Sequence, residues 1–150
     1  MKFQKLYDRI KKLQTPLNQI LEDVLKDNDI EESIIKLNQE QLYDQGVQAD
    51  GSTTGQYTED SKIQKYWAGV DGTGDSRSDH ITGKDTGETY ASMQVKINPD
   101  SFIITADDRN DFFEEHAPKG LGLTNESIKE ILPEVKQLFI EKYKKAIGFA

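Results

Sequence analysis

The sequence predicts a single α+β domain in which helices accompany a small antiparallel sheet. Apolar residues recur every three or four positions over 1–45 and again over 124–147, as in amphipathic helices. Residues 93–106 instead alternate apolar and polar, the period of a half-buried strand. We therefore divide the 150 residues of one domain into three parts. These are a helical region, an extended polar loop region (46–86), and a hairpin with a C-terminal helix packed on the sheet (87–150).

The helical region opens with an apolar seam whose members alternate at spacings of three and four. Its members are Phe3, Leu6, Ile10, Leu13, Leu17, Ile20 and Val24. A heptad seam of this kind packs either on the protein's own core or against another subunit. Because Pro16 falls inside it, a kink or a fresh helix start is expected near Thr15.

A second helix is expected after a polar break. Asp27-Asn28-Asp29 interrupts the apolar pattern and supplies a capping side chain. Helical spacing then continues to about Tyr43, and Gly46 ends the element. The apolar positions that mark it are Ile30, Ile34, Leu37 and Leu42.

The polar loop region is rich in glycine, aspartate, serine and threonine and poor in aliphatic residues. A loop of this length is often functional or ordered by a partner. A short helix is expected at Glu59–Ala68, carrying Ile63, Tyr66 and Trp67. Together with Tyr57, these two aromatic residues are either satellite core residues or anchors for a partner. Tyr57, Tyr66, Trp67, Phe3, Leu6 and Ile10 are thus the interface candidates.

The third part of the chain, residues 87–150, predicts a hairpin and a final helix. Met93, Val95 and Ile97 alternate with polar residues, and Phe102, Ile104 and Ala106 repeat the pattern after the turn Asn98-Pro99-Asp100. A lone hairpin is marginal in water, so it must pack on helices, gain a strand or pair with a neighbouring subunit.

Beyond the hairpin, a short helix is expected at Arg109–Glu115, followed by a glycine turn. Thr124 or Asn125 can cap the final helix, in which Pro133 predicts a short first turn and a restart.

Composition narrows the function. A net charge of −8 argues against nucleic-acid binding through a basic face and against docking to anionic lipid, although an acidic protein could line a channel for DNA. The chain has no cysteine for a thiolate site or disulfide. We expect no signal peptide and no membrane span. Only 35% of residues are apolar, which suggests a core completed by neighbouring molecules.

One group of acidic residues is a candidate for a catalytic site. On a helix, Asp108, Asp111 and Glu115 would share a face and could hold magnesium for phosphodiester cleavage. The alternative is a solvated acidic face beside Phe112 and Phe113. The segment Asp71–Asp79 lacks the glycine and final glutamate of a calcium loop, and the two histidines are too few for a His-rich zinc site. We therefore expect no catalytic, metal or cofactor residues.

Four marked stretches follow one another along the chain. A glycine region comes first, then a Thr-Gly element, then an aromatic-to-histidine stretch, and last a Gly-Leu turn before the final helix. They are Leu42–Tyr57, Thr86-Gly87-Glu88-Thr89-Tyr90-Ala91-Ser92, Phe112-Phe113-Glu114-Glu115-His116 and Leu121-Gly122-Leu123-Thr124. In this order, the four stretches resemble the virion-morphogenesis (tail-completion) proteins of tailed bacteriophages.

The resemblance implies a non-enzymatic structural protein that forms a homo-oligomeric ring at the neck or tail end of a virion, either in tail completion or in head–tail joining. Its expected partners are copies of itself and other neck, portal or tail proteins, assembled in the host cytoplasm. Two alternatives from other classes remain. One is the magnesium-dependent nuclease, and the other is a small cytoplasmic adaptor that oligomerises through the N-terminal seam.

Overall fold

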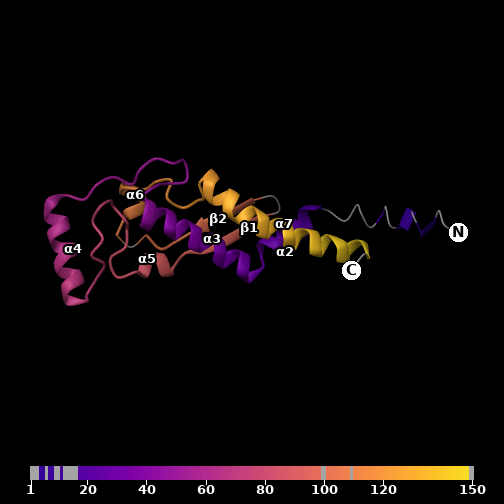
Figure 1. Cartoon of the computed structure of the whole chain (residues 1–150), viewed down its shortest axis with the longest axis horizontal. Helices are drawn as coiled ribbons and strands as arrows, with labels where there is room; N and C mark the ends of the chain where they lie inside the picture. Colours follow the sequence, from indigo (N-terminus) through magenta and orange to yellow (C-terminus); the bar gives the residue numbers. More distant parts are fainter. Residues whose placement is uncertain are drawn as a thin grey trace.

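The structure is a computed structural model that describes residues 4–5, 7–8, 11, 17–98, 101–108 and 110–148. Its described part is elongated, with α4 at one end and the C-terminal end of α7 towards the other (Figure 1). The elements in chain order are α2 (Leu17–Leu25), α3 (Asn28–Glu40), the π-helical turn η1 (Gln41–Gln45), α4 (Glu59–Asp71), α5 (Glu88–Ala91), β1 (Gln94–Asn98), β2 (Ser101–Thr105), α6 (Phe112–Glu115) and α7 (Asn125–Ile147).

The fold is α+β, as the sequence predicts. The main core lies where α2, α3 and α7 meet one face of the hairpin, and burial of these side chains is its main stabilisation. The C-terminal helix meets the sheet there, because Ile131 of α7 and Ile104 of β2 belong to one cluster. The fully or nearly buried members are Val24, Leu25, Ile30, Ile34, Leu37, Ile104, Leu123 and Ile131.

The predicted hairpin is confirmed. Val95 pairs with Ile104 and Ile97 with Phe102 in an antiparallel register, so all four apolar side chains fall on one face and reach the core. Ile103, on the other face, is exposed. Pro99 and Asp100 of the expected turn lie outside the described residues.

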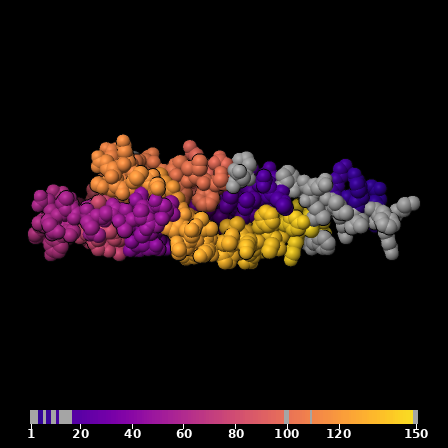
Figure 2. All heavy atoms as spheres, turned by 90° about the horizontal axis from the view of Figure 1, so that it is seen from above, coloured from indigo at the N-terminus to yellow at the C-terminus, as the bar shows by residue number. Residues whose placement is uncertain are grey.

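A second cluster organises the polar loop region. Its buried members come from η1, the loop, α5, α6 and the short turns that follow these two helices. They are Leu42, Ile81, Tyr90, Met93, Phe112, Phe113 and Ala117. Region 46–86 is therefore tied to the body at several points, although its backbone is mostly irregular outside α4. Figure 2 shows that this end of the molecule lies opposite the helical end formed by α2 and α7.

Two buried amides hold the glycine turn that precedes α7. Asn38 Nδ2 donates to the carbonyl oxygens of Gly120 (2.8 Å) and Gly122 (3.1 Å). Gln41 Oε1 accepts from the backbone N–H of Thr124 at 2.9 Å and from the Ser127 hydroxyl at 3.1 Å. These bonds satisfy backbone groups that burial would otherwise leave unpaired. The Gly-Leu turn is thereby fixed against α3.

Helix boundaries agree with the expectations in most places. Asp27 caps α3 through its carboxylate, Gly46 ends η1 with φ 64°, and Thr124 caps α7 by accepting the Ser127 N–H at 3.2 Å. Ile20 and Val24 are buried in the protein's own core. Leu17, also a seam residue, is 55% exposed. The seam residues Phe3, Leu6, Ile10 and Leu13, and the expected break at Pro16, lie outside the described residues.

Two boundary predictions were wrong. Pro133 does not divide the final helix, because α7 runs unbroken through it. The proline is exposed, so water can satisfy the carbonyl that loses its helical partner. The expected helix over 109–115 begins only at Phe112, because Asp111 takes a left-handed conformation with φ 52°. In contrast, the helix expected at Glu59–Ala68 is present and extends to Asp71.

Candidate functional site

Helix α4 presents its apolar side chains to solvent. Ile63, Tyr66, Trp67 and Val70 are 56%, 60%, 57% and 59% exposed, and no residue of α4 is buried. Their spacing of i, i+3, i+4 and i+7 places them along one side of the helix. The rings of Tyr66 and Trp67 pack edge to face with centroids 5.3 Å apart. We call these four residues the outer face of α4.

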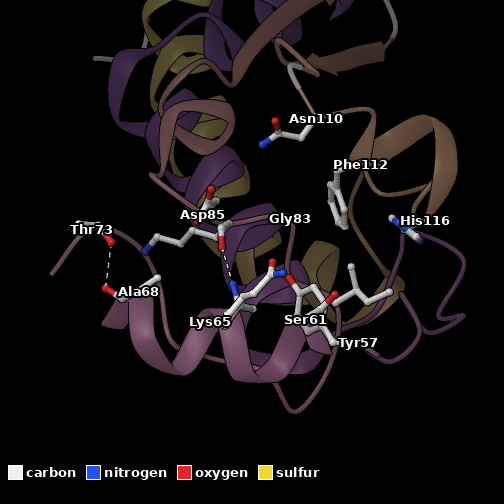
Figure 3. A pocket seen from close by; sticks show the side chains of 13 residues that line it. Tyr57, Ser61, Lys65, Ala68, Thr73, Gly83, Asp85, Asn110, Phe112 and His116 are labelled. Carbon is white, nitrogen blue, oxygen red and sulfur yellow. Dashed lines mark hydrogen bonds between the residues drawn. The ribbon is translucent and has the colours of Figure 1, made fainter. Parts of the chain in front are cut away.

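The opposite side of α4 is small and polar, and it meets the body of the protein. Ser61, Lys65 and Ala68 line the space between the helix and the body (Figure 3). Gly69 lies so close to the loop that an added Cβ would collide with the side chain of Ser76. This arrangement inverts the usual one, in which the apolar side of a surface helix faces the core.

Lys65 is the principal tie between α4 and the loop behind it. Its Nζ donates to the Lys84 carbonyl oxygen at 2.9 Å and lies 3.7 Å from Asp75 Oδ2. The side chains of this ion pair are only 11% and 14% exposed, which reduces solvent screening. The other Asp75 oxygen accepts the Tyr43 hydroxyl at 2.7 Å, and this bond raises the pKa of Tyr43. One carboxylate thus joins α4 to η1.

The ends of α4 are also fixed. The Thr58 hydroxyl accepts the Ser61 N–H at 3.2 Å, and Gly72 closes the helix with φ 67°. Beyond it, the Asp75 N–H donates to the Asp85 carbonyl oxygen at 2.9 Å. The protruding helix is therefore anchored at both ends as well as in the middle, so its outer face is held in a defined orientation.

Arg77 reinforces the same loop from the side. It donates to the carboxylates of Asp44 (3.0 Å) and Asp79 (2.9 Å) while its guanidinium lies 5.0 Å from the centroid of the Tyr43 ring. The hydrogen bond from Arg77 lowers the pKa of Asp79. These contacts connect the loop to η1 over a sequence separation of about thirty residues.

The structure separates the aromatic interface candidates. Tyr57 is half-buried in the cavity behind α4, where its hydroxyl accepts the Thr82 N–H at 3.1 Å and its ring lies 5.1 Å from Lys65 Nζ. That cavity has a volume of about 490 Å³ and opens between α4, Phe112 and His116 (Figure 3). Tyr57 thus supports the fold locally. Of the aromatic candidates that the structure describes, Tyr66 and Trp67 face solvent.

The three candidate carboxylates do not share a helical face. Asp108 precedes α6 and accepts the N–H groups of Phe113 (2.9 Å) and Glu114 (3.1 Å) through Oδ2, which makes it a cap for that short helix. Its Oδ1 is buried and has no hydrogen-bond partner. Asp111 and Glu115 are both exposed. Among the described residues, no group of three or more His, Cys, Asp or Glu side chains is arranged to hold a metal ion.

A second apolar surface lies on the helical part of the molecule. A groove of about 340 Å³ runs between α2, α7 and β2, and its lining is almost wholly apolar. On α7 its edge is formed by Ile128 and Leu132, which are 42% and 40% exposed. The other described lining residues are Leu21, Leu25, Ile34, Ser101, Phe102, Leu123, Ile131 and Val135. We call this the α2–α7 groove.

Sequence reasoning identified Tyr66 and Trp67 but missed the groove and the orientation of α4. The orientation had a signal. Ser61, Ala68 and Gly69 lie opposite the apolar residues at helical spacing, and small residues on one side of a helix allow close approach to a neighbouring segment. The groove had no such signal in the sequence, because its described lining residues come from α2, α3, β2 and the stretch 123–135, which are separate in the chain.

Comparison of the chain with protein-family models, curated proteins and solved structures finds no match. In the described part of the chain, the search for a helix of membrane-spanning length and hydropathy also finds none.

Proposed function

We propose that this chain is a non-enzymatic structural subunit of a tailed-phage virion, and that copies of it form a ring at the neck in tail completion or head–tail joining. The observation that carries the proposal is the outer face of α4. A firmly anchored helix that directs two aromatic and two aliphatic side chains into solvent is suited to contact another protein.

The sequence motifs support the same proposal. The Thr-Gly element leads through α5 into β1, and Gly87 takes φ 89° where the chain enters α5. Ser92, its last residue, accepts the Asp107 N–H at 2.8 Å and so ties the start of the hairpin to its exit. The Gly-Leu turn is held by Asn38 and Gln41. The segments that carry the resemblance therefore have structural roles at the joints of the fold.

The charge is compatible with a position around a DNA channel. A net charge of −8 disfavours tight contact with the phosphate backbone, so DNA passing through a ring of such subunits would not adhere to it. The proposed partners are copies of this chain and the adjoining neck, portal or tail proteins.

Deletion of the gene in the phage that encodes it tests the proposal. Lysates of the deletion strain, imaged by electron microscopy, should contain DNA-filled heads and separate tails that have not joined. Supplying the intact gene from a plasmid should restore complete particles. Normal numbers of infectious, joined particles without the gene would refute a role at the neck.

A further inference from the structure

We propose that the outer face of α4 in one copy docks into the α2–α7 groove of a second copy. This inference rests on the proposed function, because it names the contact through which the subunits of the ring would join. The two surfaces are both apolar, are both present in every copy, and lie on different parts of the elongated molecule (Figures 1 and 2).

The size of the outer face is that of a functional patch. From Ile63 to Val70 it runs about 10 Å along the helix, given a rise of about 1.5 Å per residue. Tyr66 and Trp67 are both more than half exposed. Aromatic side chains of this size offer on the order of 100 Å² each when half exposed, so the face presents roughly 300–400 Å².

That area is below what a stable dimer needs. A stable pairwise interface buries about 800 Å² on each partner, so one such contact alone gives weak association. A ring improves this, because every subunit would use its outer face on one neighbour and its groove on the other. The area buried per subunit doubles, and the last contact closes the ring without a further loss of translational freedom.

The groove has the chemistry to receive the outer face. Its lining comes from Leu21 and Leu25 of α2, Phe102 of β2, and Ile128 and Leu132 of α7, together with the buried residues behind them. A volume of about 340 Å³ admits large side chains. Insertion of an aromatic side chain into such a groove removes apolar surface of both partners from water.

The charges beside the two surfaces are complementary. On α4, the exposed carboxylates Asp60 and Asp71 lie three residues before Ile63 and four after Trp67, so they follow one edge of the outer face. The other acidic residue there, Glu59, is paired with Lys62 at 2.9 Å.

On α7, Lys129 and Lys136 are exposed three residues before and four residues after Leu132. These two lysines therefore lie along the edge of the groove, as Asp60 and Asp71 lie along the edge of the outer face. An acidic edge on one copy would therefore meet a basic edge on the next, which selects this pairing over a contact between two α4 helices, where the acidic edges would repel.

The pairing is head to tail. Because the contact joins two different surfaces, each added copy leaves one outer face and one groove open. Such contacts close into a ring when the rotation between copies permits, and form a filament when it does not. An identical pair of surfaces would instead stop at a dimer.

Directed disulfide formation tests the contact in the 150-residue chain, which has no native cysteine. One variant carries Val70→Cys on the outer face, and the other carries Leu132→Cys on the groove edge. The two proteins are mixed, oxidised and digested, and the peptides are identified by mass spectrometry. The matched control replaces the second variant by Glu130→Cys, an exposed site on the same helix that does not share the groove edge.

We expect the mixed 70–132 disulfide to exceed both the 70–130 control and the 70–70 product by about tenfold, because docking raises the effective concentration of the two thiols. Equal yields of the mixed and control disulfides would overturn the contact. A dominant 70–70 product would also overturn it, since that would mean that two α4 helices pair with each other.

The result is separable from the proposed function. If the protein is present in virions but the 70–132 disulfide does not exceed its control, the contact is wrong and the neck role stands. If the disulfide forms as expected but virions lack the protein, the contact stands and the neck role fails.

Discussion

Gly83 shows how tightly a single residue of the loop packs against the side chains around it. It has a φ of 65°, and an added Cβ would overlap the ring of Phe112 in the second core cluster. Gly72 has nearly the same φ, 67°, but no heavy atom lies within 4 Å of the position of its missing Cβ. The two glycines therefore share the conformational requirement and differ in the space around them.

Replacing each glycine by alanine separates these effects. Both variants should lose about 1 kcal/mol in free energy of unfolding, because an alanine side chain is strained in the left-handed region. Gly83→Ala should lose a further 1–3 kcal/mol or so, because Phe112 must move. Urea unfolding with an unchanged m-value would give the difference. Equal losses in the two variants would mean that Phe112 yields freely and that this part of the core is loosely packed.

Tyr90 makes the stability of the folded state decrease at alkaline pH. Its hydroxyl donates to the Thr82 carbonyl oxygen inside the second cluster, and burial raises the pKa of Tyr90 above its usual value near 10. The folded state thus holds this proton more tightly than the unfolded state does. Stability from Tyr90 is complete below about pH 10 and falls as the pH rises from there towards the raised pKa.

Tyr90→Phe should therefore be less sensitive to alkali than the parent protein. Between about pH 9.5 and 11, the parent should lose up to about 1.4 kcal/mol per pH unit more than the variant in free energy of unfolding. Tyr66→Phe is the control, because Tyr66 is exposed. A Tyr90→Phe curve parallel to that of the parent over this range would contradict the raised pKa.

At the scale of the element, α4 differs from the other long helices. Helices α2, α3 and α7 bury apolar residues in the main core, and most of their sequence periodicity reports that contact. Helix α4 has the same kind of periodicity, but its apolar side faces outward and its anchoring depends on Lys65 and the two end caps. Periodicity locates an apolar side without saying what covers it.

Two substitutions on α4 should therefore affect different properties, one self-association and the other stability. Trp67→Ser should change the free energy of unfolding by no more than about 0.5 kcal/mol, because the side chain is already exposed, but it should weaken self-association. Lys65→Met should cost about 1–3 kcal/mol in stability, because the Lys84 carbonyl oxygen and Asp75 lose a partner.

Thermal unfolding and light scattering at high protein concentration measure the two effects. A large loss of stability in Trp67→Ser would mean that Trp67 belongs to the protein's own core. In that case α4 would no longer count as an interaction surface.

At the scale of the whole molecule, the sequence predicted the class, the hairpin and most helix boundaries, because these depend on local periodicity and capping. Thr124 and Asp27 are examples in which one capping side chain fixes a helix start. The unbroken α7 and the late start of α6 were not predicted, since solvent exposure of Pro133 and the conformation of Asp111 depend on tertiary surroundings.

The candidate site was predicted in part for the same reason. Tyr66 and Trp67 could be singled out as aromatic residues in a region with few aliphatic ones. The role of Tyr57 under α4 depends on Thr82 and Lys65, which come from other segments. The capping role of Asp108 likewise depended on where α6 begins.

The most direct test of the proposed neck role is quantitative mass spectrometry of purified tailed-phage virions, with the major capsid protein as the internal standard. A ring subunit should be present in several copies per particle and should remain after washing in high salt, because its apolar contacts are insensitive to screening. Particles that are intact and infectious but lack the protein would contradict the claim.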